Sequence, residues 1–466
     1  MWPMKRHNLG LRTRGRSFSR KRATTITFAA GIKGFALLMA AVLLFAAPLP
    51  GQKMSRTDRD MAVAMVENIS SDVQKNYFDP KLHGLDWGTL TKEARENIKN
   101  APDMAAANAQ IEGLLERLND SHTNFYPTTN STPVDYGWQF QVIGKRAFIT
   151  DVSPKSDAES KGMRPGDELL TINGFNVERS SAFKLKYAMG VLAPRTSIRV
   201  VLRDPTGKIL QLQVDAKVIQ HPAVYGLGGS SWWSNQRRID MEDAWERARA
   251  EYKEFGQELM IVRVPAFVQS GADVERLFSK ARDHKSLIID LRSTPGGRLD
   301  SVLDFLAGVF DRDVKVGQAL ARNKTTTLTV KGSRRGAFEG DLIVLIDSES
   351  ASGAEIFARV VQLEERGAIL GDHSSGSVME AQFFPHRYGD NPVFFYGSMV
   401  TVADTLMTDG KSLEGVGVQP DRAFLPTPAD LAAGRDPVLA YAASLAGVSL
   451  SPEDAAKLFP RPKPKE

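Results

Sequence analysis

The chain contains no cysteine among its 466 residues. Disulfide bonds, thiolate nucleophiles and cysteine-ligated metal sites are therefore excluded. The seven histidines show no spacing typical of a metal site, so we expect neither a metal ion nor another cofactor. Even in an oxidising compartment, the fold must be stabilised by its apolar core.

Acidic side chains are absent from residues 1–50, which contain nine Lys or Arg. Without this segment, 51 basic and 55 acidic side chains remain, and the net charge changes from +5 to −4. The basic character therefore belongs to the leader, and it predicts no binding to nucleic acid.

The leader (residues 1–53) has one uncharged apolar run, Phe35–Ala47, which follows a basic stretch. A run of this length is typical of the apolar region of a signal peptide. An uncleaved signal anchor is the alternative, because Thr24–Ala47 is nearly long enough to span a membrane if Lys33 is tolerated. Either form predicts export to the periplasm or another extracytoplasmic compartment, and the uncleaved form would be attached to the inner membrane.

The rest of the chain, with ordinary contents of 42% hydrophobic and 25% charged residues, predicts a multidomain globular protein. Residues 54–130 have apolar positions three and four apart, which predicts helices ending near Asn119. Residues 135–219 alternate β-rich runs with turns and predict a β-rich domain. Residues 220–256 contain Trp232-Trp233 and a helix-like charged stretch (240–253), and predict a connector.

Residues 257–425 alternate apolar strands with amphipathic helices. This pattern predicts a mostly parallel sheet whose ligand-binding loops lie at the carboxyl ends of the strands. In its clearest unit, strand 342–346 leads through a serine-rich loop into a helix. Residues 426–466 are expected to form a C-terminal tail, with Pro460–Glu466 disordered.

Ser352 stands at the predicted start of this helix. Unpaired backbone N–H groups and the helix dipole favour an alkoxide or an oxyanion there. Ser352-Gly-Ala-Glu355 is also a capping box, in which both side chains satisfy backbone N–H groups. Taken alone, the motif favours this structural interpretation, and motifs elsewhere in the chain reverse the preference.

Gly162-Met-Arg-Pro-Gly-Asp-Glu-Leu-Leu-Thr-Ile-Asn-Gly174 resembles the signature of a PDZ domain. The apolar segment 182–191 suits the helix that lines a PDZ groove. The resemblance implies that this domain takes an extended peptide, often a chain end, onto the edge of its sheet. A structural β-module without a ligand is the alternative.

Three motifs follow one another in the α/β region: Leu291-Arg-Ser-Thr-Pro-Gly-Gly297, Ser350-Ala-Ser-Gly-Ala-Glu355 and Leu413-Glu-Gly-Val-Gly-Val-Gln-Pro-Asp421. With the PDZ-like and helical regions, they resemble the C-terminal-processing (tail-specific) proteases and the related tricorn core proteases over about residues 56–425. The resemblance implies a crotonase-like (ClpP/crotonase-type) catalytic domain and a serine-type peptidase that acts on polypeptides.

By this resemblance, Ser352 aligns with the nucleophile, and the N–H groups of Gly353 and Gly297 (Gly296 is the weaker candidate) align with the oxyanion hole. Glycine lets the backbone approach the substrate, and fixed N–H donors stabilise the charge of the tetrahedral state. A tight strand-to-helix turn would explain the two loop glycines without any chemistry. A phosphate loop is a poor match, because no Gly-Lys-Ser/Thr follows.

One branch of the family uses a lysine base 25 residues after its nucleophile, and here Ser377 stands at that position. The tricorn-like branch uses a Ser-His-Ser-Glu tetrad instead. Asp120-Ser121-His122-Thr123 resembles its histidine segment, and Glu414 lies in the matching late motif. The resemblance implies that His122 is the general base for Ser352.

In the same tetrad, Glu414 would orient or polarise the site through Ser121 or a further hydroxyl. Other candidates are weaker. His373 could line the site, Lys411 could be a displaced base, and Asp290 with Arg292 is expected to be a structural pair.

The leading hypothesis is an exported serine endopeptidase that forms an acyl-enzyme on Ser352. An inactive peptide-binding protein that retains the protease fold is the alternative. A crotonase-like acyl-transfer enzyme acting on a small molecule is a third hypothesis, which the PDZ-like module disfavours.

Overall fold

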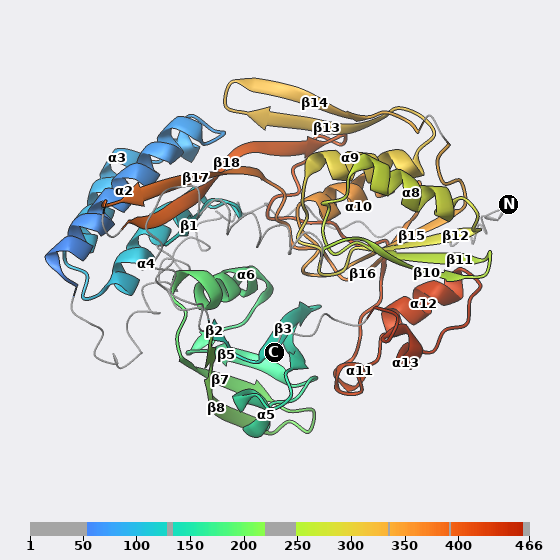
Figure 1. Ribbon diagram of the computed structural model, residues 1–466, viewed down its shortest axis with the longest axis horizontal. Coiled ribbons are helices and arrows are strands. Elements are labelled where there is room, and N and C mark those ends of the chain that lie inside the picture. The colour runs from blue at the N-terminus through green and yellow to red at the C-terminus, as the bar shows by residue number, and fades with distance from the viewer. Residues whose placement is uncertain (1–53, 128–133, 220–247, 334–335, 391–392, 460–466) are drawn as a thin grey trace, which may run out of the picture.

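The computed structural model describes residues 54–127, 134–219, 248–333, 336–390 and 393–459 (Figure 1). The leader, Trp232-Trp233 and Pro460–Glu466 lie outside these ranges. Among the residues described, none of the helices combines the length and the hydrophobicity that a membrane span requires.

The N-terminal region is a bundle of α2 (Arg56–Asn76), α3 (Trp87–Lys99) and α4 (Met104–Leu115), with the short turns η1 (Leu82–Gly84) and η2 (Glu116–Leu118). Each long helix begins at a side-chain cap, namely Ser55, Asp86 and Asp103. The apolar faces meet in one core, which also takes in Phe125 and Tyr396 from outside the bundle. Later segments of the chain are therefore packed against the early helices.

The β-rich domain has a sheet in the order β3-β4-β5-β7-β8, with β6 beside β5 and a separate pair of β2 and β9. Its elements are β2 (Val134–Asp135), β3 (Trp138–Ile143), β4 (Arg146–Val152), α5 (Asp157–Ser160), β5 (Glu168–Ile172), β6 (Phe175–Asn176), α6 (Arg179–Tyr187), η3 (Ala188–Leu192), β7 (Ser197–Arg203), β8 (Ile209–Asp215) and β9 (Lys217–Val218). Strand β3 lies at an edge of the sheet and contacts α6.

The α/β unit has a sheet in the order β10-β11-β12-β15-β16-β19, which is parallel from β11 onward, as the alternating pattern predicts. Its strands are β10 (Glu251–Phe255), β11 (Leu259–Arg263), β12 (Ser286–Asp290), β15 (Asp341–Ile346), β16 (Ala368–Gly371) and β19 (Arg422–Ala423). Helices α8 (Gly271–Ala281), α9 (Leu299–Val309) and α10 (Gly353–Leu363) cover one face (Figure 1). Both faces are buried, so Ile288 and Ile289 belong to different core clusters and the strands are continuously apolar.

The predicted C-terminal tail is instead the second cover of this sheet. Helices α11 (Pro428–Ala432), α12 (Pro437–Leu445) and α13 (Pro452–Ala455) follow β19, and α12 and α13 lie on the face opposite α9 (Figure 1). Val438, Leu439 and Ala442 of α12 are buried in the core with Ile288. A parallel sheet is normally covered on both faces, so the apolar face opposite α9 requires such a layer.

The prediction of a helix over 240–253 is wrong at its end, because Glu251–Phe255 forms strand β10, which is antiparallel to β11. Gly256 adopts a φ of +56° in the turn between the two strands. Polar side chains are tolerated on an edge strand, so the charged composition gave no sign of sheet pairing.

A further sheet joins the bundle to the α/β unit, and its strands β1, β13, β14 and β17 were not predicted. Its order is β1 (Asn124–Tyr126), β18 (Phe394–Met407), β13 (Val314–Ala321) and β14 (Lys324–Val330), with β17 (Glu380–Tyr388) also paired to β18. Strand β18 pairs with β1 at Asn124↔Met399 and with β13 at Gly317↔Met407. It thereby places the segment after α4 next to the α/β unit (Figure 1).

The predicted structural pair is confirmed. Arg292 donates to both carboxylate oxygens of Asp290 at 2.8 and 2.7 Å, and to those of Asp436 at 2.9 and 2.7 Å. This cluster ties the end of β12 to the start of α12.

Candidate active site

Ser352 precedes α10 in a strained backbone conformation, with φ 53° and ψ −115°. A non-glycine residue in this region costs free energy and persists only where its surroundings hold it. Its N–H donates to the carbonyl of Ser377 at 2.7 Å and to Oε2 of Glu355 at 3.0 Å, within the predicted capping box. These contacts hold a half-buried serine at the amino end of the helix.

The glycine loop lies directly against this turn. A Cβ built on Gly296 would be 2.6 Å from Cβ of Ser352 and 3.0 Å from the nitrogen of Gly353. Among the described residues, the N–H groups of Gly296, Gly297 and Gly353 donate no hydrogen bond. Unpaired backbone donors beside a serine are what an oxyanion hole requires.

Replacing Gly296 by alanine is expected to lower kcat/KM about 10- to 100-fold, because the added methyl group would displace Ser352 from the oxyanion donors. The φ of +102° at Gly296 adds backbone strain. Gly410→Ala is the matched control, since Gly410 has a φ of +77° with nothing within 4 Å of the added Cβ. Steady-state kinetics of both variants test this prediction, and equal losses in the two would contradict it.

The turn that carries His122 is fixed by Asp120. The Asp120 carboxylate accepts the N–H groups of His122 and Thr123 at 2.9 and 2.7 Å, and the Thr401 hydroxyl of β18 at 2.9 Å. Sequence reasoning gave Asp120 no role. The sequence does contain a signal that could have identified this role. An aspartate followed by turn residues often accepts backbone N–H groups two residues further on.

Ser121 connects the His122 ring to Glu414. Ser121 Oγ lies 2.7 Å from His122 Nδ1 and donates to Glu414 Oε2 at 3.0 Å. Glu414 also accepts the N–H groups of Ser121 at 2.8 Å and Val378 at 2.9 Å. Burial raises the pKa of Glu414, and these donors oppose the shift by favouring the carboxylate.

The tautomer of the ring follows from the number of protons available. A carboxylate only accepts, so the single proton of Ser121 goes to Glu414. His122 Nδ1 must then carry the proton in its contact with Ser121, which leaves the lone pair on Nε2. Burial lowers the pKa of His122, so the ring is held neutral, as a general base must be.

Ser377 joins this histidine group to the Ser352 turn. Its hydroxyl donates to Ser121 Oγ at 2.8 Å, and its carbonyl accepts the Ser352 N–H at 2.7 Å. Among the described residues, no hydrogen bond joins the Ser352 hydroxyl to the His122 ring. Catalytic hydrogen bonds commonly tighten only when substrate is bound.

Glu355 organises the loop that faces the Ser352 turn. Its buried carboxylate accepts hydrogen bonds from the Ser374 hydroxyl at 2.5 Å and from the N–H groups of Gly376 and Ser377 at 2.7 and 2.9 Å. Burial raises the pKa of Glu355 to about 7, although the hydrogen bonds from these donors act to lower it. The sequence indicated a helix cap here, but it could not show that residues 374–377 fold onto the same carboxylate.

The weaker candidates lie outside the hydrogen-bond network of Ser121, His122, Glu414 and Ser377. The carbonyl of His373 accepts from Arg179 at 2.8 Å, and burial lowers the pKa of its ring. Lys411 is exposed, and its side chain contributes no hydrogen bond to the described site.

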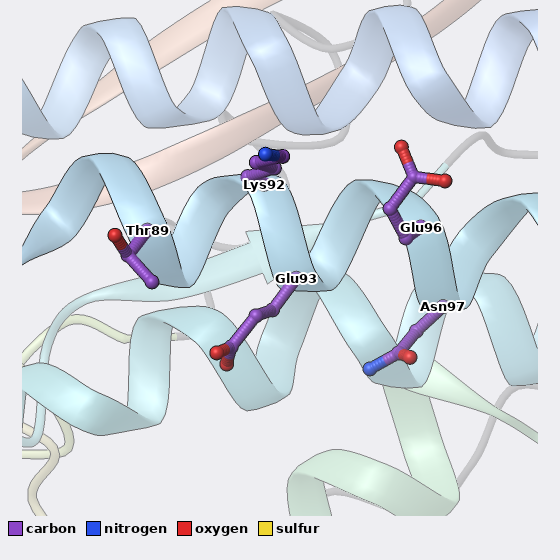
Figure 2. Close-up of a pocket in the computed structure, with 5 residues that line it drawn as sticks. All are labelled: Thr89, Lys92, Glu93, Glu96 and Asn97. Carbon is purple, nitrogen blue, oxygen red and sulfur yellow. The ribbon is translucent and has the colours of Figure 1, made fainter.

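A shallow depression of about 590 Å³ lies elsewhere, on the outer side of α3 (Figure 2). Its five lining residues, from Thr89 to Asn97, are polar, and their side chains point in different directions (Figure 2). It contains none of the candidate site residues. Nor do the described ranges contain a group of three His, Asp or Glu side chains arranged to hold a metal ion.

Residues 258–424 match peptidase family S41. The chloroplastic carboxyl-terminal-processing peptidase 1 of Arabidopsis thaliana is 20% identical over 382 residues, which cover 78% of this chain and 72% of that protein. The tail-specific protease of Haemophilus influenzae is 30% identical over 355 residues, which cover 70% of this chain but 48% of that protein, so the chain spans about half its length.

The crystal structure of mature CPAF aligns with a TM-score of 0.59 at 14% identity, covering 80% of this chain and 94% of that one. This likeness shows a shared fold. The match of residues 258–424 to peptidase family S41 and the similarity to processing proteases over most of the chain together show a serine-type peptidase.

Proposed function

We propose that the chain is an exported serine endopeptidase in which Ser352 is the nucleophile and His122 is the general base. The observation that carries the proposal is the hydrogen-bonded series Glu414–Ser121–His122, which Ser377 connects to the strained Ser352 turn. A nucleophile, a base and an orienting carboxylate thus meet beside unpaired N–H donors.

In the first half of the reaction, the Ser352 oxygen attacks the scissile carbonyl while His122 Nε2 takes the hydroxyl proton. The N–H groups of Gly353 and Gly297 stabilise the oxyanion. His122 then returns the proton to the leaving amine as the C–N bond breaks, leaving an acyl-enzyme. In the second half, water attacks the acyl carbon while His122 takes its proton. The bond between that carbon and the Ser352 oxygen then breaks, His122 returns the proton to Ser352, and the carboxylic acid product is released.

The β-rich domain is proposed to be a PDZ domain that recruits chain ends or unfolded segments. Strand β3 lies at the edge of its sheet beside α6, which is the arrangement that β-augmentation needs. The carbonyl of Val142 on β3 accepts the hydroxyl of Ser348 at 2.5 Å, four residues before Ser352. A polypeptide recruited to this edge would lie close to the nucleophile, and the tail-specific name of a relative agrees with recognition of chain ends.

A fluorophosphonate probe separates this proposal from the inactive peptide-binding alternative. The serine oxygen displaces fluoride from the probe only where an activated nucleophile is present. Labelling of Ser352 in leaderless protein, located by peptide mass spectrometry, together with cleavage of an unfolded protein is the expected result. Robust binding of peptide tails without labelling would establish the alternative.

A further inference from the structure

We infer that Ser377 is a positioning residue, which orients Ser121 against the His122 ring and holds the two halves of the active site in register. This inference rests on the proposed function. The side chain of Ser377 is neither the nucleophile, nor the base, nor the orienting carboxylate of that proposal.

The first support is the complete set of hydrogen bonds around Ser121 Oγ. A hydroxyl has one proton and two lone pairs. Ser121 donates to Glu414 at 3.0 Å, accepts from Ser377 at 2.8 Å, and lies 2.7 Å from His122 Nδ1. With the Ser377 proton on one lone pair, the remaining lone pair is directed to Nδ1–H, which fixes the orientation of Ser121 relative to the ring.

The second support is the position of Ser377 between the two halves of the site. Its N–H donates to Glu355 Oε2 at 2.9 Å, and the same oxygen accepts the N–H of Ser352 at 3.0 Å. Its carbonyl accepts the Ser352 N–H directly. One residue therefore contacts the backbone of the nucleophile and, through its hydroxyl, the partner of the base.

The hydroxyl and the backbone of Ser377 can be separated experimentally. Ser377→Ala keeps the backbone contacts and removes the hydroxyl, so that Ser121 has an open lone pair and the His122 ring loses its fixed partner geometry. Loss of a neutral hydrogen bond of this kind corresponds to about a three- to tenfold effect. We expect kcat to fall by that factor while KM stays within about twofold, because the bond acts on the base and not on substrate binding.

Two further variants provide the controls. Ser377→Thr restores a hydroxyl and is expected to recover most of the kcat. Ser375→Ala makes the same change two residues away in the same loop, where no side-chain hydrogen bond is formed within the described site, and should leave kcat unchanged. Selective ¹⁵N labelling of histidine, with His122 assigned by its variant, should show the Nδ1–H tautomer in both proteins and a displaced Nδ1–H resonance in Ser377→Ala.

A wild-type kcat in Ser377→Ala would overturn the inference, as would equal losses in the alanine and threonine variants, or an unchanged Nδ1–H resonance in Ser377→Ala. Ser352→Ala, measured alongside, separates the two proposals. Cleavage that persists in Ser352→Ala removes the proposed function itself, whereas an inactive Ser352→Ala beside a fully active Ser377→Ala removes only the role of Ser377.

Discussion

Replacing His122 by alanine is expected to lower kcat/KM for polypeptide cleavage about a thousandfold. The ring is the only imidazole hydrogen-bonded to the Ser121–Glu414 group within the described site. Without it, the Ser352 hydroxyl has no base to accept its proton, and the remaining acceleration comes from substrate binding and the oxyanion hole. Cleavage of an unfolded protein by purified leaderless protein measures the effect.

His373→Ala is the matched control for this loss. His373 lies in the loop before Ser377, and its carbonyl contacts Arg179. We expect kcat/KM of this variant to stay within about threefold of the wild type, because general acid–base catalysis requires a ring in the proton path. A large loss in His373→Ala with an active His122→Ala would reverse the assignment of the base.

Replacing Glu112 by glutamine is expected to stabilise the protein at alkaline pH. Glu112 is buried in α4 and accepts the N–H of Phe125 at 2.7 Å, close to the histidine turn. The Tyr187 hydroxyl contacts both the carbonyl of Phe125 and, at 3.3 Å, Glu112. The Phe125 carbonyl can only accept, so it takes the single proton of Tyr187, and Glu112 relies on the Phe125 N–H as its donor.

The pH dependence follows from the shift of this carboxyl group. Burial raises the pKa of Glu112 from 4.5 to about 8. The folded state therefore retains a proton that the unfolded state loses, and the free energy of unfolding falls as pH rises from about 4.5 to 8, by about 4 kcal/mol in total. Glutamine cannot ionise, and its amide oxygen can still accept the Phe125 N–H.

Urea unfolding at pH 4.5 and pH 8.5 measures this difference. We expect Glu112→Gln to be more stable than the wild type by about 4 kcal/mol at pH 8.5 and within about 1 kcal/mol of it at pH 4.5. Glu93→Gln, at an exposed position on α3, is the control and should change neither value. The account of Glu112 would be wrong if the glutamine variant gained nothing at the higher pH.

Local patterns were sufficient for the parallel sheet and for the turn at Ser352. The apolar run Leu342–Ile346 is the buried strand β15, and the helix begins immediately after the serine. The ordered motifs also identified Ser121, His122 and Glu414, which the structure joins by hydrogen bonds. Their roles in catalysis remain a proposal that the experiments above test.

Long-range pairing was beyond the reach of the same patterns. The sequence gives no sign that β18 pairs with β1 at one end and β13 at the other, although this pairing brings the histidine turn to the α/β unit. The role of Ser377 was missed for a related reason. Its hydroxyl contacts a side chain 256 residues earlier in the chain, and no local spacing encodes such a contact.

The rate at which a fluorophosphonate labels Ser352, followed against pH in the wild type and in His122→Ala, tests the central claim most directly. Phosphonylation of the serine needs only the nucleophile and its base, so substrate recruitment does not enter. The wild-type rate is predicted to rise with pH through one transition below the ordinary histidine pKa of 6.5, because burial lowers the pKa of His122, and the transition should be lost in the variant together with most of the rate. An unchanged rate and an unchanged transition in His122→Ala would contradict the assignment.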